Sequence, residues 1–147
     1  LINNCVGNNA PIVDAEAGLK IFNRMSEAAE LGLLRACHDL SEGGIAVALA
    51  EMAFSGGFGA DAELGNIPGD VKKDSVILFS ESNTRFIAEV RKADKKAFEG
   101  LMKGVPMGLI GAVSGKKSLR IYGAGGKKII DAGIDELKKA WQKPLDW

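Results

Sequence analysis

Apolar residues at intervals of three and four positions predict an amphipathic helix over residues 14–31, DAEAGLKIFNRMSEAAEL. Asp14 is suited to cap its first turn, and Gly32 follows as the residue that ends it. The residues that share the apolar face are Gly18, Phe22, Met25 and Ala29. This first segment is therefore expected to be a helix with one apolar side.

The rest of the chain alternates between strand-like and helical patterns. A second helix over residues 45–54 is apolar on almost every side, which indicates burial on most of its surface. Extended segments are expected at 33–39, 60–64, 85–90, 107–113, 118–122 and 127–130, and further helices at 94–103, with Asp94 as its cap, and 134–141. Glycine-rich turns separate several of them, at 55–59 and 65–70. Because no strict β-α-β rhythm links these elements, the predicted fold class is α+β, a mixed sheet with helices packed on it.

Composition and charge argue against several classes of protein function. The 147 residues carry 19 Lys and Arg against 19 Asp and Glu, without the basic excess of a nucleic-acid-binding protein. No apolar run approaches the roughly 20 residues of a transmembrane helix, so no membrane partner is expected. The two cysteines, Cys5 and Cys37, fit neither a disulfide scaffold nor a zinc site, which favours a reducing, cytoplasmic location.

The domain organisation is expected to be a single domain over residues 1–147. No internal repeat and no long linker divides the chain. It begins at Leu1 without an initiator methionine, which favours a piece of a longer polypeptide.

The segment CHDLSEGG, residues 37–44, is the first candidate site. An extended segment that turns through glycines into a helix presents free backbone N–H groups at the positive end of the helix dipole. Gly43 and Gly44 would let a phosphate approach the chain closely. A simpler interpretation needs no ligand, because Ser41 is a good N-cap and Glu42 suits the first turn.

The charges of this segment restrict the ligand. Asp39 and Glu42 would repel a bare phosphate, so a bound phosphate would need a bridging divalent cation such as Mg²⁺. Asp39 is the better candidate ligand, and Glu42 is expected to face solvent. Cys37 and His38 are adjacent in an extended segment and point to opposite faces, which argues against a nucleophile–base pair. Cys37 is expected to be buried and inert.

The second candidate is FSESNTRF, residues 79–86, in which polar residues lie between the apolar run SVILF and a strand. Such a cluster is able to hydrogen-bond a sugar or an amide, and Arg85 suits an anion. The alternative is a polar turn with Arg85 lying along the sheet surface.

HDLSEGGIAVALAEM followed about thirty residues later by LFSESNTRF resembles the C-terminal domain of the aminoimidazole-ribotide-synthase-like superfamily. Within it, the resemblance is closest to the phosphoribosylformylglycinamidine synthase family, and the segments PIVDAEAGLKIF, AAELGLLRACHD and IDELKKAWQKPL agree with it. The resemblance implies an ATP-dependent C–N ligase of purine biosynthesis. Such an enzyme converts formylglycinamide ribonucleotide and glutamine-derived ammonia to the amidine.

The resemblance also implies cofactors, partners and site residues. ATP or ADP with Mg²⁺ would bind between this domain and an N-terminal domain of the same polypeptide, and a glutaminase subunit or domain would supply ammonia. The chain alone is then expected to be inactive. The implied roles are nucleotide or phosphate binding for His38, Ser41, Gly43 and Gly44, ribonucleotide substrate binding for Glu81, Ser82, Asn83 and Arg85, and Mg²⁺ binding for Asp39.

Two alternatives to this interpretation remain. The first is that the site holds a structural nucleotide and does not turn over substrate. Asn83 stands where the substrate-contacting copy of the domain usually has Gln, and HDLSEGG is typical of the duplicated half, which in some members holds a structural nucleotide. The other is that the chain comes from a different superfamily member, of the selenophosphate synthetase or thiamine-phosphate kinase type, or is a non-catalytic binding module of the same fold.

Overall fold

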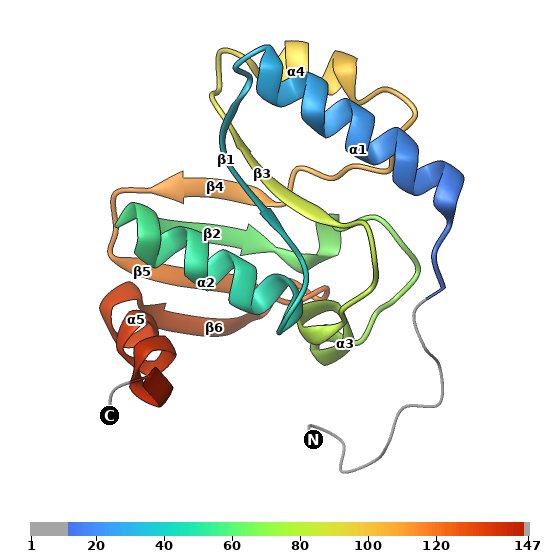
Figure 1. Cartoon of the computed structure of the whole chain (residues 1–147). Coiled ribbons are helices and arrows are strands. Elements are labelled where there is room, and N and C mark those ends of the chain that lie inside the picture. The colour runs from blue at the N-terminus through green and yellow to red at the C-terminus, as the bar shows by residue number, and fades with distance from the viewer. Residues whose placement is uncertain (1–11, 146–147) are drawn as a thin grey trace.

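The computed structural model describes residues 12–145 and confirms the α+β class (Figure 1). Its elements, in chain order, are α1 (Ala15–Glu30), β1 (Leu34–Asp39), α2 (Gly44–Gly56), β2 (Gly59–Glu63), the 3₁₀ turn η1 (Leu64–Asn66), α3 (Asp74–Phe79), β3 (Phe86–Val90), α4 (Lys95–Leu101), β4 (Gly111–Ser114), β5 (Ser118–Tyr122), β6 (Lys128–Gly133), α5 (Ile134–Gln142) and η2 (Lys143–Leu145). No helix in this described part is long and apolar enough to cross a membrane.

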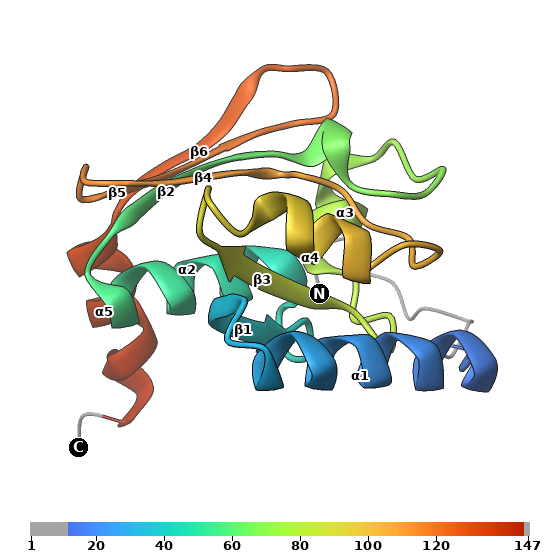
Figure 2. The same ribbon diagram turned by 90° about the horizontal axis from the view of Figure 1, so that it is seen from above.

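The strands form two sheets rather than the one that the sequence predicts. A four-stranded sheet has the order β4-β2-β5-β6, in which β2 and β5 are parallel and the other pairs antiparallel. The remaining strands, β1 and β3, form a separate antiparallel ribbon. Figure 2 shows α2 between the four-stranded sheet and this ribbon, with α1 on the other side of the ribbon.

Helix α2 is at the centre of the larger hydrophobic core, as its apolar sequence predicts. Its buried residues are Gly44, Ile45, Ala48, Leu49 and Ala53. They pack with buried residues of the sheet, of α3 and of the ribbon, namely Leu40, Ala62, Leu64, Ile77, Leu78, Ile87, Leu119 and Ile121. Both sheets and α3 are therefore fixed in position by contact with one helix.

Helix α1 has the predicted ends, and its buried face agrees with the prediction in part, since Gly18 is buried and Met25 packs against a second hydrophobic core. The side chain of Asp14 accepts a hydrogen bond from the N–H of Ala17 at 2.9 Å, and Gly32 adopts a positive φ just beyond the helix. Phe22 and Ala29, predicted to share the apolar face, are exposed, while Ala28 is completely buried in a second core with Phe98 and Met102 of the α4 region. The face is rotated because α1 packs on α4 as well as on the ribbon.

One further segment had no predicted secondary structure, and two others differ from the prediction. The apolar run SVILF forms the short helix α3, which buries Ile77 and Leu78 against α2. Asp94 occupies the N-cap position of α4, but its side chain makes no capping hydrogen bond. The strand expected over residues 107–113 begins only at Gly111, where β4 pairs with β2.

Candidate functional site

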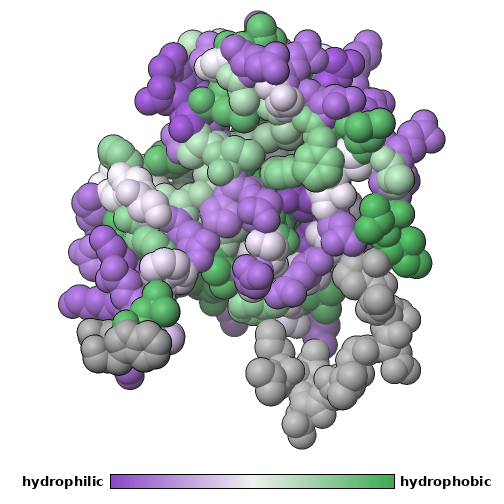
Figure 3. Space-filling model, in the orientation of Figure 1, coloured by the Kyte–Doolittle hydropathy of each residue, from purple (hydrophilic) through white to green (hydrophobic). Residues whose placement is uncertain are grey.

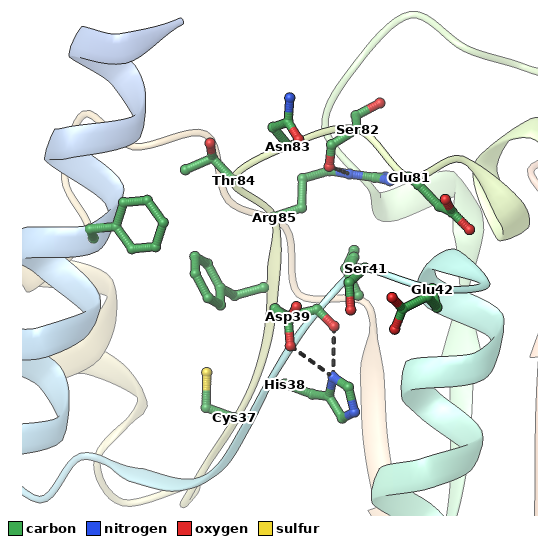
Figure 4. Close-up of a pocket in the computed structure, with 13 residues that line it drawn as sticks. Cys37, His38, Asp39, Ser41, Glu42, Glu81, Ser82, Asn83, Thr84 and Arg85 are labelled. Atoms are coloured by element: carbon green, nitrogen blue, oxygen red, sulfur yellow. Dashed lines mark hydrogen bonds and ion pairs between the residues drawn. The ribbon is translucent and has the colours of Figure 1, made fainter. Parts of the chain in front are cut away.

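A groove of about 820 Å³ lies where the ribbon meets the N-terminus of α2 (Figure 4). It is lined by Phe22, Cys37, His38, Asp39, Leu40, Ser41, Glu42, Glu81, Ser82, Asn83, Thr84, Arg85 and Phe86. Both candidate segments therefore contribute to one groove. Gly43 and Gly44 are not among the lining residues.

Strand pairing brings the two segments together. In the antiparallel ribbon Asp39 at the end of β1 lies opposite Phe86 at the start of β3. One residue beyond the strands, the N–H of Leu40 donates to the carbonyl of Arg85 at 2.9 Å. Residues that follow β1 are thus held beside residues that precede β3, although about forty positions separate them in the sequence.

A hydrogen bond also joins the two segments at the start of α2. The N–H of Gly43 donates to Oε1 of Glu81 at 2.9 Å. Gly43 is the N-cap of α2, with φ 77° and no side-chain cap, so the interpretation of Ser41 as N-cap is wrong. Glu42 is exposed, as expected. A carboxylate therefore already lies at the position where the sequence suggests an anion.

Gly44 has a structural reason to be glycine. Its φ is 63°, and a Cβ at this position would lie 2.7 Å from the carbonyl oxygen of Leu78 and 2.8 Å from that of Ser80. The close approach that glycine allows is thus to the end of α3. This packing places the loop that follows α3 beside the start of α2.

His38 is held at both ring nitrogens. Nδ1 lies 2.6 Å from the carbonyl oxygen of Asp39, and Nε2 lies 2.7 Å from Oε2 of Glu51 on α2. Both partners are hydrogen-bond acceptors, so this geometry favours the doubly protonated ring, which donates from both nitrogens. Partial burial alone would lower the pKa of His38, but the hydrogen bonds to Asp39 and Glu51 outweigh burial and raise it.

Glu51 has a second partner that the sequence pattern does not reveal. Its Oε1 accepts a hydrogen bond from Nε1 of Trp141 on α5 at 2.7 Å. The Trp141 ring also lies 5.8 Å from that of Phe54, centroid to centroid. The C-terminal helix is thereby connected to the wall of the groove.

Arg85 folds back onto its own loop. Its guanidinium donates to the carbonyl and the hydroxyl of Ser80, the latter at 3.1 Å, and Nε donates to the carbonyl of Ser82 at 3.3 Å. Burial lowers the pKa of Arg85 from its ordinary value. The side chain fixes the loop instead of lying along the sheet surface.

Thr84 adds a second constraint on this loop. It has φ 61°, a left-handed conformation that is unusual for a β-branched residue and costs on the order of 1–3 kcal/mol. Gly18 of α1 packs against it, because a Cβ there would lie 3.4 Å from Oγ1 of Thr84. The loop from 80 to 85 is therefore held in one conformation.

The expectation that Cys37 is buried is wrong. The residue is exposed and belongs to an apolar wall of the groove with Phe22 and Phe86, whose rings meet edge to face at 5.6 Å. Partial burial of the sulfur in this wall, and then the charge of Asp39, raise the pKa of the thiol. Figure 4 confirms that Cys37 and His38 point in opposite directions.

On the face drawn in Figure 3, hydrophobic side chains gather below α1, over the ribbon.

The family is decided by a sequence comparison. Residues 3–124 match the family described as AIR synthase related protein, C-terminal domain. The chain belongs to this family. The match includes both groove-lining segments of this AIR synthase related domain and ends before β6 and α5.

Solved structures share the fold of this AIR synthase related domain. PurL of Thermotoga maritima complexed with FGAR has a TM-score of 0.80 at 19% identity, covering 91% of this chain and 23% of that chain. The same protein complexed with ATP gives 0.72 at 20% identity, covering 80% and 21%. The hydrogenase maturation protein HypE in complex with ATP gives 0.61 at 18% identity, covering 76% and 39%. The chain thus spans about a quarter of the PurL chains that it matches.

The metal-binding capacity of this AIR synthase related domain is limited. In residues 12–145 no group of three or more His, Cys, Asp or Glu side chains is arranged to hold a metal ion. Asp39 is exposed in the groove, with Oδ1 3.5 Å from Nδ1 of His38. One carboxylate fits Mg²⁺ only where phosphate oxygens, water or another domain supply the remaining ligands.

Proposed function

We propose that this chain is the C-terminal-type domain of a phosphoribosylformylglycinamidine synthase, an ATP-dependent C–N ligase of purine biosynthesis. The full enzyme would convert formylglycinamide ribonucleotide and glutamine-derived ammonia to the amidine. This domain would supply one wall of a nucleotide or ribonucleotide site. An N-terminal domain of the same polypeptide would supply the other wall, and a glutaminase subunit or domain the ammonia.

The observation that carries the proposal is the convergence of the two segments on one groove. Its volume, about 820 Å³, lies within the range of roughly 300–1,000 Å³ typical of small-molecule sites. Constraints at Thr84 and Arg85 hold the polar loop before any ligand arrives, which lowers the entropy cost of binding.

The polar wall suits a sugar or amide ligand. Ser82 and Asn83 are exposed in the groove, and their side chains make no hydrogen bond to another described residue. Asn83 offers both a donor and an acceptor, so it is able to hydrogen-bond an amide or a ribose hydroxyl.

Asp39 is the residue of this chain that would hold Mg²⁺, and the bound ion would neutralise phosphate charge. In the absence of the ion, the carboxylates of Asp39, Glu42 and Glu81 outnumber the cationic groups of the groove, His38 and Arg85, and make it unfavourable for a bare phosphate. Nucleotide binding is therefore expected to require metal.

The comparisons favour PurL over the second candidate, a HypE-like protein. PurL complexed with FGAR covers 91% of this chain at a TM-score of 0.80, whereas the HypE chains cover 76–77% at 0.61–0.63. A domain of the PurL type is expected to respond to formylglycinamide ribonucleotide, and a domain of the HypE type only to ATP.

Calorimetric titration of the 147-residue chain with MgADP, and separately with formylglycinamide ribonucleotide, tests the proposal. Asn83→Ala should weaken ribonucleotide binding about three- to tenfold, the effect of one lost hydrogen bond. Asn23→Ala, an exposed asparagine on α1 outside the groove, is the matched control and should bind like the wild type. Equal affinities of the Asn83→Ala and Asn23→Ala variants for the ribonucleotide would contradict the proposal.

A further inference from the structure

A chain of hydrogen bonds leads from the C-terminal helix to the groove. Nε1 of Trp141 donates to Oε1 of Glu51 at 2.7 Å, and Nε2 of His38 donates to the other oxygen, Oε2, at 2.7 Å. Nδ1 of His38 donates to the carbonyl of Asp39 at 2.6 Å. Each of the three contacts has the distance of a strong hydrogen bond, and together they connect α5, α2 and β1.

Glu51 and His38, the two side chains in the middle of this series of hydrogen bonds, have little freedom to change rotamer. Both oxygens of Glu51 and both nitrogens of His38 are engaged, and the two side chains are only 24% and 29% exposed. The His38 ring is unable to rotate without losing a partner at one end. The Asp39 peptide is therefore held at the point where β1 opens into the groove.

The connection starts outside the segment that defines the family. The family match ends at residue 124, and α5 begins at Ile134. Helix α5 packs on α2 through Leu137, which contacts the larger core, and through the Trp141 and Phe54 rings. Helix α5 is thus held on α2 by apolar contacts, which stabilise it. It also donates the hydrogen bond from Trp141 to Glu51 that begins the connection to the groove.

We propose that Glu51 is a positioning residue of the groove, through which Trp141 of α5 orients the His38 ring and fixes Asp39. Glu51 does not itself line the groove and acts only through His38. Its effect on ligand affinity rests on the proposed function, whereas its effect on the geometry of His38 and Asp39 does not.

NMR spectroscopy of the 147-residue chain at one fixed pH tests this role, because His38 is the only histidine and its ring N–H signals are assigned without ambiguity. Trp141→Phe removes the donor but keeps an aromatic ring, and Glu51→Gln replaces the acceptor of His38. Leu137→Ala is the matched control, since it weakens the packing of α5 and leaves all three hydrogen bonds in place.

We expect Trp141→Phe and Glu51→Gln to remove or shift the Nε2–H signal of His38 and to shift the amide signals of Asp39 and Leu40. Leu137→Ala should lower stability and leave these signals unchanged. Unchanged signals in the first two variants, or equal shifts in Leu137→Ala, would overturn the proposal. MgADP affinity should fall about three- to tenfold in both Trp141→Phe and Glu51→Gln and should not change in Leu137→Ala. If the wild-type chain does not bind MgADP, the expectation that this domain binds the nucleotide by itself fails, while the ring and amide signals still decide the positioning role.

Discussion

The carboxylate of Glu81 accepts a hydrogen bond from the backbone N–H of Gly43 at 2.9 Å, across 38 positions of sequence. This contact gives α2 the cap that its own residues do not provide, because Gly43 has no side chain. It also explains why the loop from 80 to 85 and the start of α2 face the same groove. Glu81 therefore stabilises the start of α2 and also lines the groove.

Replacement of Glu81 should reveal this capping role. We expect Glu81→Ala to lower the free energy of unfolding by about 0.5–1.5 kcal/mol, the usual cost of a lost N-cap. Glu42→Ala is the control, because Glu42 is an exposed carboxylate of the same region without a hydrogen bond to another described residue. Urea unfolding of both variants measures the difference, and an equal loss in the two would mean that only the local charge matters.

Gly44 should tolerate substitution much less than another glycine of similar conformation. Gly44→Ala combines a positive φ of 63° with contacts of 2.7–2.8 Å to two carbonyl oxygens, and we expect a loss of about 3 kcal/mol or more. Gly32→Ala is the control, because its φ is 67° and nothing lies within 4 Å of the added Cβ. There we expect about 1 kcal/mol from conformation alone. Similar midpoints in urea would contradict the packing of Gly44 on α3.

The local signals of the sequence predicted most elements but not the contacts between them. The cap of α1 was predictable because Asp14 and Ala17 are three residues apart. The cap of α2 was not, because it comes from a residue 38 positions away and only the pairing of β1 with β3 brings it near. Ser41 has the right residue type for a cap, yet the two following glycines start the helix later.

The candidate site was also predictable only in part, from its residue types and not from its contacts. Residue types marked most of the polar wall, since Asp39, Glu81 and Asn83, which were singled out in the sequence, line the groove. The apolar wall was not recognised, because an isolated Phe22 on an amphipathic helix is indistinguishable from a core residue. The support of His38 by Trp141 depends on how α5 packs, which no short pattern encodes.

The stability of the protein should depend on pH through His38. Its pKa is raised in the folded state, so its stabilising contribution is complete below the unfolded value of about 6.5. The contribution is lost as the pH rises through the higher folded-state pKa. The difference in unfolding free energy between wild type and His38→Gln should therefore shrink above pH 6.5. A difference that grows with pH would contradict the raised pKa.

Cys37 should react slowly despite its exposure. Because partial burial and Asp39 raise the pKa of its thiol, the fraction of thiolate at neutral pH is smaller than for a free cysteine. Alkylation by iodoacetamide, followed by mass spectrometry of the peptide that contains Cys37, should give a pH midpoint above the ordinary value of 9.0. A midpoint below that value would show that the sulfur lies in a different environment.

The most direct test of the central claim is an amide NMR titration of the 147-residue chain with MgADP, with MgCl₂ alone and with formylglycinamide ribonucleotide. If the two segments form one ligand groove, saturable shifts should appear together at residues 39–46 and 81–85. In the titration with MgADP, these shifts should require both the metal and the nucleotide. Shifts confined to one of the segments, or to the surface of β4 and β6, would contradict a shared groove.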